Sequence, residues 1–422
     1  MLHSLYRWIG RYSIPWLIGL LVLGLGGMMG SPTTGQSVMA QQSSYQTGLV
    51  VWQAAEQGFA DWQLAGIEIT PEGTLQLDPP TAEWQRDPYP AGGYREGNFY
   101  NGGEFWLGEA ISPITPTTFG FVGALASWNT TTPAGSWVEV QLRAQIKDGW
   151  TKWYSYGVWT SHPSATVQPH SIDEQADEHG NLYTDLLVLK DEIQGSSALQ
   201  VKVRLFSEQE TAIPVLRQAA VATSTIPIQA ESGISGNPAL WNRSLSLPEC
   251  SQMVYADGGE VWCSPTSVAM VKAYWQSSQA ACEPQVRATV AGVYDWLYDG
   301  HGNWAFNVAH ATSQGLLGYV ARLNSLAAAE PWIAAQVPVV FSFAWQEGEL
   351  AGAAIPKSDG HLAVLVGFNT QGDPIVHDPA AARDSEVRRT YPRAQLEKLW
   401  LGASGGTVYL IYPPQQKVPV FG

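Results

Sequence analysis

GGEVWCSPTSVAMVKAYW (258–275) is the stretch that decides the fold of the C-terminal half, because it sets one cysteine directly before a helix. Ser264 and Pro265 are typical of a first helical turn, and the apolar residues after them recur at helical spacing. The unpaired N–H groups and positive dipole end of a helix N-terminus stabilise a thiolate. Cys263 is therefore a candidate nucleophile, and the alternative is a buried structural cysteine.

Two strand-like segments downstream supply a candidate base and its partner. His361 opens the apolar run of SDGHLAVLVGF (358–368), and VHDPA (376–380) places Asp378 at the end of the next run. Two adjacent antiparallel strands would bring these side chains together, so that the carboxylate orients the imidazole. His377 is a competing base, but neighbouring strand residues point to opposite faces, and Asp378 is the better orienter.

The three motifs GGEVWCSPTSVAMVKAYW, GHLAVLVGF and HDPA together resemble the C39-like branch of the papain-like cysteine peptidases, over roughly residues 246–415. The resemblance implies a papain-like α+β fold and the catalytic order Cys263, His361, Asp378. It implies no cofactor. Well-known C39 domains trim leader peptides within transporters, but this sequence has no ATP-binding loop and no bundle of spanning helices, so that role is not carried over.

One position departs from the family pattern. The oxyanion-hole glutamine usually lies about six residues before the cysteine, where this sequence has Asp257. An ionised carboxylate would repel a developing oxyanion. Gln252, eleven residues before the cysteine, is the expected substitute, together with the backbone N–H of Cys263.

The sequence pattern of the N-terminal half is typical of an all-β domain. Residues 45–215 contain short alternating runs between Gly, Pro, Asn and Thr clusters, and WVEVQLRA (137–144) and ALQVKVRLF (198–206) each place apolar residues on one face. We expect an antiparallel β-sandwich or jelly roll there. Small residues, Gly and Pro then indicate a connection over 216–245.

The sequence pattern of residues 246–417 predicts both helices and strands, which indicates an α+β region. Helices are predicted over 264–276, 285–297 and 303–314, and strands follow in VPVVFSF, HLAVLVGF, DPIVHDP and TVYLIY. Helices first and strands afterwards is typical of a segregated α+β domain. The fold class is therefore multidomain, a β-sandwich followed by a papain-like peptidase fold.

The N-terminal segment, residues 1–40, resembles a signal peptide. Arg7 and Arg11 precede the apolar stretch 14–29, and small residues near Ala40 suit cleavage. An uncleaved anchor is the alternative, and membrane attachment is expected only in that case. We expect a secreted or periplasmic protein. The net charge of −15 and the absence of a basic cluster argue against nucleic acid as a partner.

Three cysteines in an oxidising compartment favour one pair and one free thiol. If Cys263 is catalytic, Cys250 and Cys282 form the possible disulfide, and the alternative is two buried thiols. A metal centre is not expected, because the histidines lie apart and neither HExxH nor CxxC occurs. The acidic residues Asp173, Asp177 and Glu178 fit no EF-hand spacing and indicate a solvated loop.

Aromatic residues are concentrated in GWTKWYSYGVW (149–159). Exposed rings on a sandwich can stack on sugars, which would give cell-wall or glycan contact through the N-terminal domain. The simpler interpretation is that these rings fill the sandwich core.

The sequence thus predicts an exported thiol hydrolase that cleaves a peptide or amide bond in a peptide or protein substrate. One rival is an amidase or transpeptidase acting on peptide cross-links through the same residues. The other is a non-catalytic binding protein that keeps the papain-like fold.

Overall fold

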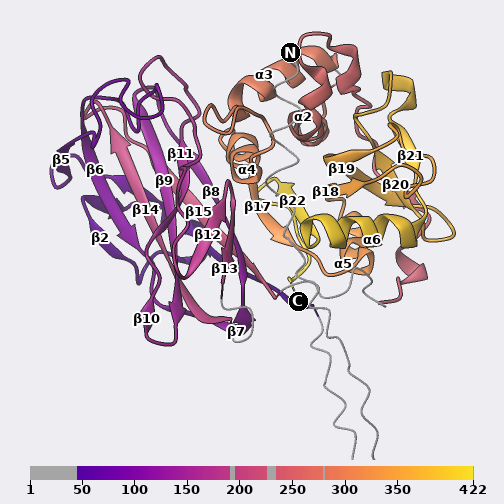
Figure 1. Cartoon of the computed structure of the whole chain (residues 1–422), viewed down its shortest axis with the longest axis horizontal. Helices are drawn as coiled ribbons and strands as arrows, with labels where there is room; N and C mark the ends of the chain where they lie inside the picture. Colours follow the sequence, from indigo (N-terminus) through magenta and orange to yellow (C-terminus); the bar gives the residue numbers. More distant parts are fainter. Residues whose placement is uncertain (1–44, 191–194, 226–233, 279–280, 422) are drawn as a thin grey trace, which may run out of the picture. The chain divides into compact units, whose positions relative to one another are not determined.

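Two antiparallel sheets face each other in the N-terminal part of the computed structural model, which describes residues 45–190, 195–225, 234–278 and 281–421 (Figure 1). The first sheet contains β1 (Thr47–Gln53), β3 (Ile67–Ile69), β4 (Leu75–Leu77), β8 (Gly123–Thr131), β12 (Gly180–Tyr183), β13 (Leu186–Leu189) and β15 (Val215–Ser224). The second contains β2 (Gln63–Ala65), β5 (Glu83–Arg86), β6 (Glu104–Ile111), β7 (Thr115–Phe121), β9 (Ser136–Ile146), β10 (Gly149–Trp150), β11 (Tyr154–Trp159) and β14 (Ser196–Ser207).

The alternating faces expected for the sandwich are confirmed in β9 and β14. These strands are antiparallel neighbours, with Val140 opposite Val203 and Leu142 opposite Val201. Their apolar side chains lie in the buried core between the sheets, and the residues between them carry the polar groups of the outer face. Period-two patterning therefore located both strands and their inner faces.

The connection expected over 216–245 is wrong in its first part. Residues up to Ser224 belong to β15, which pairs with β8 on one side and with β1 on the other. Residues 226–233 lie outside the described part of the chain. A short 3-10 turn, η2 (Pro238–Leu240), and the two-residue strand β16 (Arg243–Ser244) follow before the C-terminal region begins.

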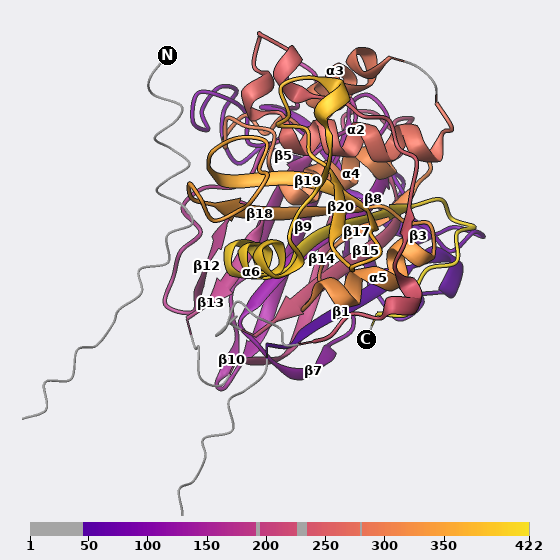
Figure 2. The same ribbon diagram turned by 90° about the vertical axis from the view of Figure 1, so that its right-hand side faces the viewer.

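The C-terminal region is α+β, with one antiparallel sheet. Its order is β17 (Leu317–Arg322), β22 (Thr407–Tyr412), β18 (Val339–Trp345), β19 (Ser358–Phe368), β20 (Pro374–His377) and β21 (Arg388–Thr390), with β16 paired to β19. The helices are α2 (Cys263–Trp275), α3 (Cys282–Val293), α4 (Trp304–Thr312), α5 (Leu326–Ala334) and α6 (Arg393–Ser404). Figure 2 shows β18 and β19 side by side.

This arrangement carries the site residues on adjoining elements. Helix α2 packs against β19, where the Ser267 hydroxyl donates to the Leu362 carbonyl over 3.2 Å. Strand β19 pairs with β20, so the start of one strand lies near the end of the next. The predicted helices and strands of this region correspond to α2 to α4, β18 to β20 and β22, whereas α5, α6, β16, β17 and β21 were not predicted.

The two regions share buried surface. Phe306 of α4 lies in the sandwich core near Trp128, with ring centroids 6.2 Å apart. Asn129 of β8 bonds both backbone groups of Gly318 in β17, over 2.7 and 3.1 Å. The sandwich is thus joined to the C-terminal sheet through apolar and polar contacts.

Candidate active site

Cys263 is the first residue of α2 and is partly exposed. No side chain caps the helix there, and residues 264–273 of the same helix are buried. The thiol therefore lies beside backbone N–H groups that have no partner within the helix, on an element held rigidly by its own burial. It is the one cysteine among the described residues that forms no disulfide.

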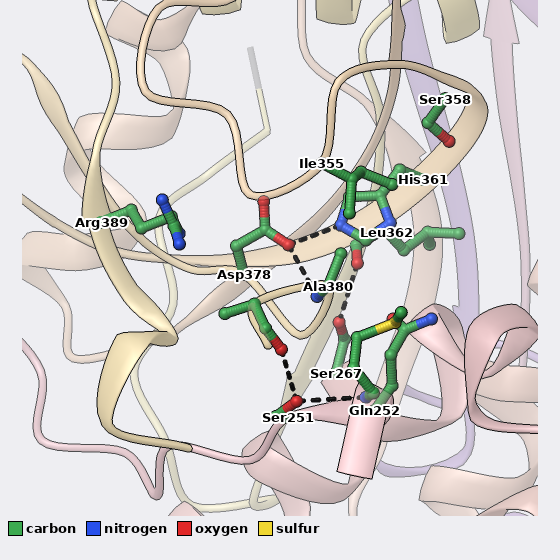
Figure 3. A network of polar contacts seen from close by, with 12 residues as sticks. Ser251, Gln252, Ser267, Ile355, Ser358, His361, Leu362, Asp378, Ala380 and Arg389 are labelled. Carbon is green, nitrogen blue, oxygen red and sulfur yellow. Dashed lines mark hydrogen bonds and ion pairs between the residues drawn. The ribbon is translucent and has the colours of Figure 1, made fainter. Parts of the chain in front are cut away.

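His361 lies in β19 and is only 2% exposed. Its Nε2 lies 2.7 Å from Asp378 Oδ1, a contact drawn as a dashed line in Figure 3. The rings of Phe343 and Trp345, from the neighbouring strand β18, pack edge-on against the imidazole, with centroids 5.4 and 5.5 Å away. The ring is thus fixed by one hydrogen bond and two aromatic contacts.

The electrostatics of His361 connect it to both proposed partners. Burial by itself lowers the pKa of this imidazole, but the charge and hydrogen bond of Asp378, with smaller contributions of the same kind from Cys263, raise the pKa to about 10. The thiol therefore lies within interaction range of the imidazole. A positively charged imidazole at this position is a favourable neighbour for a negative charge.

Asp378 follows β20 and has no exposed surface. Its Oδ1 also accepts the backbone N–H of Ala380 at 2.9 Å, and its Oδ2 accepts the Tyr391 hydroxyl at 2.5 Å. Burial opposes ionisation, but His361 and these donors outweigh it and hold the pKa of Asp378 below its usual value. The carboxylate is therefore a charged acceptor whose oxygens are both held in place.

His377 points away from this network. Its Nδ1 lies 3.2 Å from the Pro248 carbonyl, and burial lowers the pKa of the ring to about 4. A neutral imidazole held by a backbone carbonyl has no part in the His361 pair. The structure thus separates the two neighbours as strand alternation predicts.

Gln252 and Asp257 occupy different environments. Gln252 is 2% exposed, and its Nε2 donates to the Gly259 carbonyl over 2.8 Å, while its Oε1 is buried and has no partner among the described residues. Asp257 is exposed and pairs with Arg287 at 2.7 Å, an ion pair that lowers its pKa. The carboxylate in the family's glutamine position is thereby engaged at the surface.

Two short 3-10 turns hold Gln252 near the cysteine. It begins η3 (Gln252–Val254), which contacts η4 (Gly259–Val261) just before α2. A side chain at position 259 would collide with the Gln252 carbonyl, so the close contact requires glycine there. Cys250 and Cys282 form a disulfide with Cα atoms 5.6 Å apart, which ties the segment before η3 to the first residue of α3.

Tyr391 and the turn that follows Asp378 were missed by sequence reasoning. Tyr391 follows β21 and reaches Asp378 because β21 pairs with β20. Ser251 also contacts this turn, through hydrogen bonds to Ala381 and Asp384. No local motif marks these residues, because strand register and turn geometry bring them to the site.

No group of three or more His, Cys, Asp or Glu side chains in the described ranges is arranged to hold a metal ion. In the acidic loop, Asp177 Oδ1 accepts the Tyr154 hydroxyl at 2.6 Å and two backbone N–H groups. This carboxylate is a structural acceptor, which corrects its interpretation as part of a solvated loop. No helix of the described chain is long and apolar enough to cross a membrane.

Two family models match the chain. The model described as Peptidase C39 N-terminal domain matches residues 49–224, and that of the Peptidase C39-like family matches residues 244–408. No curated protein matches the chain.

Solved structures that match parts of the chain include a candidate C39-like peptidase from Bacillus anthracis, which is 18% identical with a TM-score of 0.30 and covers 42% of this chain and 100% of its own. TmCBM61, solved with β-1,4-galactotriose, is 9% identical with a TM-score of 0.22 over 40% of this chain and 93% of its own. A carbohydrate-binding module of the β-sandwich superfamily is 8% identical with a TM-score of 0.19, over 41% and 55%. The two matched stretches lie one in the sandwich and one in the C-terminal region, separated by residues 225–243, and together they support a C39-like family protein.

Proposed function

We propose that this protein is an exported cysteine peptidase or related thiol hydrolase, in which Cys263, His361 and Asp378 form a catalytic triad in a papain-like arrangement. The observation that carries the proposal is the buried His361–Asp378 pair at 2.7 Å, whose imidazole also interacts with Cys263 at the start of α2. Nucleophilic catalysis requires a nucleophile, a base and a group that orients the base. Here these are a thiol at a helix end, an imidazole on a strand and a carboxylate after the next strand.

The reaction follows from these positions. The Cys263 thiolate attacks the carbonyl carbon of a peptide or amide bond and forms a tetrahedral oxyanion. The His361 imidazolium donates its proton to the leaving nitrogen, and the C–N bond breaks to give a thioester and a free amine. Water then attacks the thioester, giving up one proton to His361; the C–S bond breaks, the carboxylic acid is released, and the Cys263 thiolate and the His361 imidazolium are restored.

The oxyanion would be bound by the backbone N–H of Cys263 and by the side-chain amide of Gln252. One N–H of that amide is committed to Gly259, which leaves the second as a donor. The exposed ion pair of Asp257 supports the choice of Gln252 over the family's usual position. Replacement of Gln252 by Ala is expected to lower kcat on the order of a hundredfold, and an unchanged rate would remove it from the site.

The peptidase activity is tested by incubating the purified protein with a peptide mixture and identifying new termini by mass spectrometry. We expect cleavage by the parent and none by Cys263→Ser, because a hydroxyl is a far weaker nucleophile beside this base. Equal cleavage by parent and variant would contradict the proposal.

An amidase or transpeptidase differs only in the acceptor of the acyl group. Adding a primary amine during the reaction distinguishes these, since a transpeptidase gives an amide-linked product and a hydrolase gives the acid. The non-catalytic alternative predicts neither product.

Export is proposed from residues 1–40, which lie outside the described part of the chain. The Cys250–Cys282 disulfide supports it, because such bonds persist in oxidising compartments. We propose cleavage near Ala40, and a mature protein whose mass still includes Met1 would contradict it.

Glycan contact is a second candidate function, for the sandwich. Of the aromatic cluster, Tyr154, Tyr156 and Trp159 are fully buried, whereas Trp150 and Trp153 are partly exposed. The Arg143 guanidinium lies over both exposed rings, 4.7 and 4.6 Å from their centroids. These rings with a cation between them favour a carboxylated glycan.

Retention of the full chain on peptidoglycan, but not on a neutral glucan, tests this function. We expect Trp153→Ala to lose retention and Trp84→Ala, an exposed tryptophan of β5, to keep it. Equal retention of both variants would contradict the assignment.

A further inference from the structure

The segment that contains Gln252 is hydrogen-bonded to the turn that begins at Asp378. The backbone N–H of Gln252 donates to the Pro379 carbonyl over 2.8 Å. The hydroxyl of Ser251 donates to the Ala381 carbonyl over 2.5 Å, and its backbone N–H donates to Asp384 Oδ1 over 2.7 Å. Figure 3 shows Ser251 and Gln252 in one network view with Asp378 and Ala380.

The opposite side of the same segment is held covalently. Cys250 precedes Ser251 and is bonded to Cys282 at the first residue of α3. Ser251 has no exposed surface, and Cys250 is 3% exposed. Residues 250–252 are thus held between the 378–384 turn and α3, which leaves the Gln252 amide little freedom to move.

The 378–384 turn therefore reaches both halves of the proposed chemistry. At its first residue, Asp378 orients His361, and from there to Asp384 it accepts three hydrogen bonds from Ser251 and Gln252. Preorganised donors stabilise an oxyanion because they need no reorganisation during the reaction, and a shift of about 1 Å can remove much of that benefit.

We propose that Ser251, Asp384 and the Cys250–Cys282 disulfide are positioning residues, which fix the Gln252 amide as an oxyanion donor. This inference rests on the proposed function. It adds that the oxyanion donor and the orienting carboxylate are aligned by one turn, and that the integrity of the disulfide controls turnover.

Cys282 is the partly exposed half of the disulfide, whereas Cys250 is 3% exposed. A cavity of about 660 Å³ is lined by Cys282, Asp384, Arg287 and neighbouring residues. A small dithiol entering it would reduce the S–S bond by thiol–disulfide exchange: its two thiols become one disulfide, and Cys250 and Cys282 each gain a proton. Residues 250–252 would then keep only their hydrogen bonds to the turn.

Two reactions of Cys263, acyl transfer and alkylation, distinguish a misplaced Gln252 amide from a general disturbance of the site. Acyl transfer develops an oxyanion, whereas alkylation by iodoacetamide displaces iodide at a saturated carbon and develops none. A change that misplaces Gln252 should therefore slow hydrolysis and leave alkylation unchanged. Unfolding or a disturbed His361 pair would slow both.

The test compares Ser251→Ala, Asp384→Ala and the double variant Cys250→Ser/Cys282→Ser with the parent. We expect kcat to fall on the order of tenfold in each, with KM within about twofold and the alkylation rate of Cys263 unchanged. Asp384 is exposed, so its variant should fold even where a buried substitution does not.

Two matched controls exist in the same region of the chain. The Ser404 hydroxyl also donates to a buried backbone carbonyl, that of Ser342 at 2.6 Å, and Asp373 accepts the backbone N–H of Arg393 at 3.1 Å. Ser404→Ala and Asp373→Ala remove similar bonds away from Gln252, and both should keep the parent's kcat.

Unchanged kcat in Asp384→Ala and in the disulfide variant would overturn the inference, as would alkylation that slows in parallel with kcat. Failure of the proposed function has a different signature. In that case the parent itself hydrolyses nothing, and its alkylation rate does not depend on His361. This result would remove the basis of the proposed function and of the positioning inference that rests on it.

Discussion

At the scale of single residues, the Asp378 carboxylate depends on Tyr391. The Tyr391 hydroxyl donates to Asp378 Oδ2 over 2.5 Å, while Oδ1 holds His361 and the backbone of Ala380. When a buried carboxylate oxygen loses its hydrogen-bond donor, its desolvation is no longer compensated, and the charged form is destabilised. Tyr391 therefore stabilises the charged form of the group that orients the base.

Tyr391→Phe should lower kcat about fivefold and the free energy of unfolding by about 1–3 kcal/mol, because one oxygen of a buried charge is left without a donor. Tyr156→Phe is the matched control. It removes a buried tyrosine hydroxyl that donates to the Ala124 carbonyl in the sandwich, so it should change stability and not kcat. Equal kcat in both variants would contradict the role of Tyr391.

The residues predicted from sequence are those with local signals. In the sequence Cys263 is followed by a serine and a proline that mark a first helical turn, and His361 and Asp378 lie at ends of strand-like runs. Tyr391 and Ser251 have no such signal, because the β20–β21 register and the turn after Asp378 bring them in. Their polar partners lie 13 residues away in the sequence for Tyr391 and 130 residues away for Ser251.

At the scale of elements, the distance between thiol and base is set by the packing of α2 on β19. The Ser267 hydroxyl, one turn into α2, donates to the carbonyl of Leu362, the residue after His361 (Figure 3). This buried bond joins the helix that carries the nucleophile to the strand that carries the base.

Ser267→Ala should lower the free energy of unfolding by about 1 kcal/mol and slow alkylation of Cys263 about threefold, since the helix can then shift against the strand. Unfolding in urea and the alkylation rate at pH 7 measure the two effects. A stability loss with no change in alkylation would show that this bond does not set the pair's geometry.

Strand β15 shows why element prediction failed at the domain connection. It lies between β8 and β1 and also contacts β17 of the C-terminal sheet. Ala219 and Val221 lie in the sandwich core, whereas Ala220 and Ala222 lie in the core of the C-terminal region. Small side chains suit the contact of two sheets, but they weaken the alternation that identifies a strand. The same residues therefore indicated a linker in the sequence.

At the scale of the whole molecule, a buried carboxylate lies where the sandwich meets α4. Asp185, in the turn between β12 and β13, accepts the backbone N–H of Trp304 at the start of α4 over 2.5 Å. Burial, with a contribution from the Asp295 carboxylate, raises its pKa to about 7. Its other oxygen is buried without a hydrogen-bond partner among the described residues.

This shift makes stability depend on pH. A folded-state pKa above the unfolded value of about 3.9 means that the folded chain binds the extra proton between these values. The contribution of Asp185 to stability is therefore fully present below about pH 4 and is lost as the pH rises to about 7. Asp185→Asn, which stays neutral, should raise Tm by ~2 °C at pH 8 and have little effect at pH 4.

Thermal unfolding of parent and variant at pH 4, 6 and 8 measures this difference. A Tm difference that does not change with pH would contradict the ionisation of Asp185 at the junction. Because α4 also places Phe306 in the sandwich core, we expect this junction to unfold together with the rest of the described chain.

The central claim is that His361 activates Cys263, and the rate of iodoacetamide labelling at Cys263 in parent and His361→Ala tests it most directly. The His361 pKa of about 10 keeps the imidazolium beside the thiol at pH 7. We predict that Cys263 is labelled at least about tenfold faster in the parent than in the variant at pH 7. The ratio of the two labelling rates should fall as the pH rises through about 10. Slow labelling, equal in the two proteins at every pH, would contradict the account and favour a binding protein without turnover.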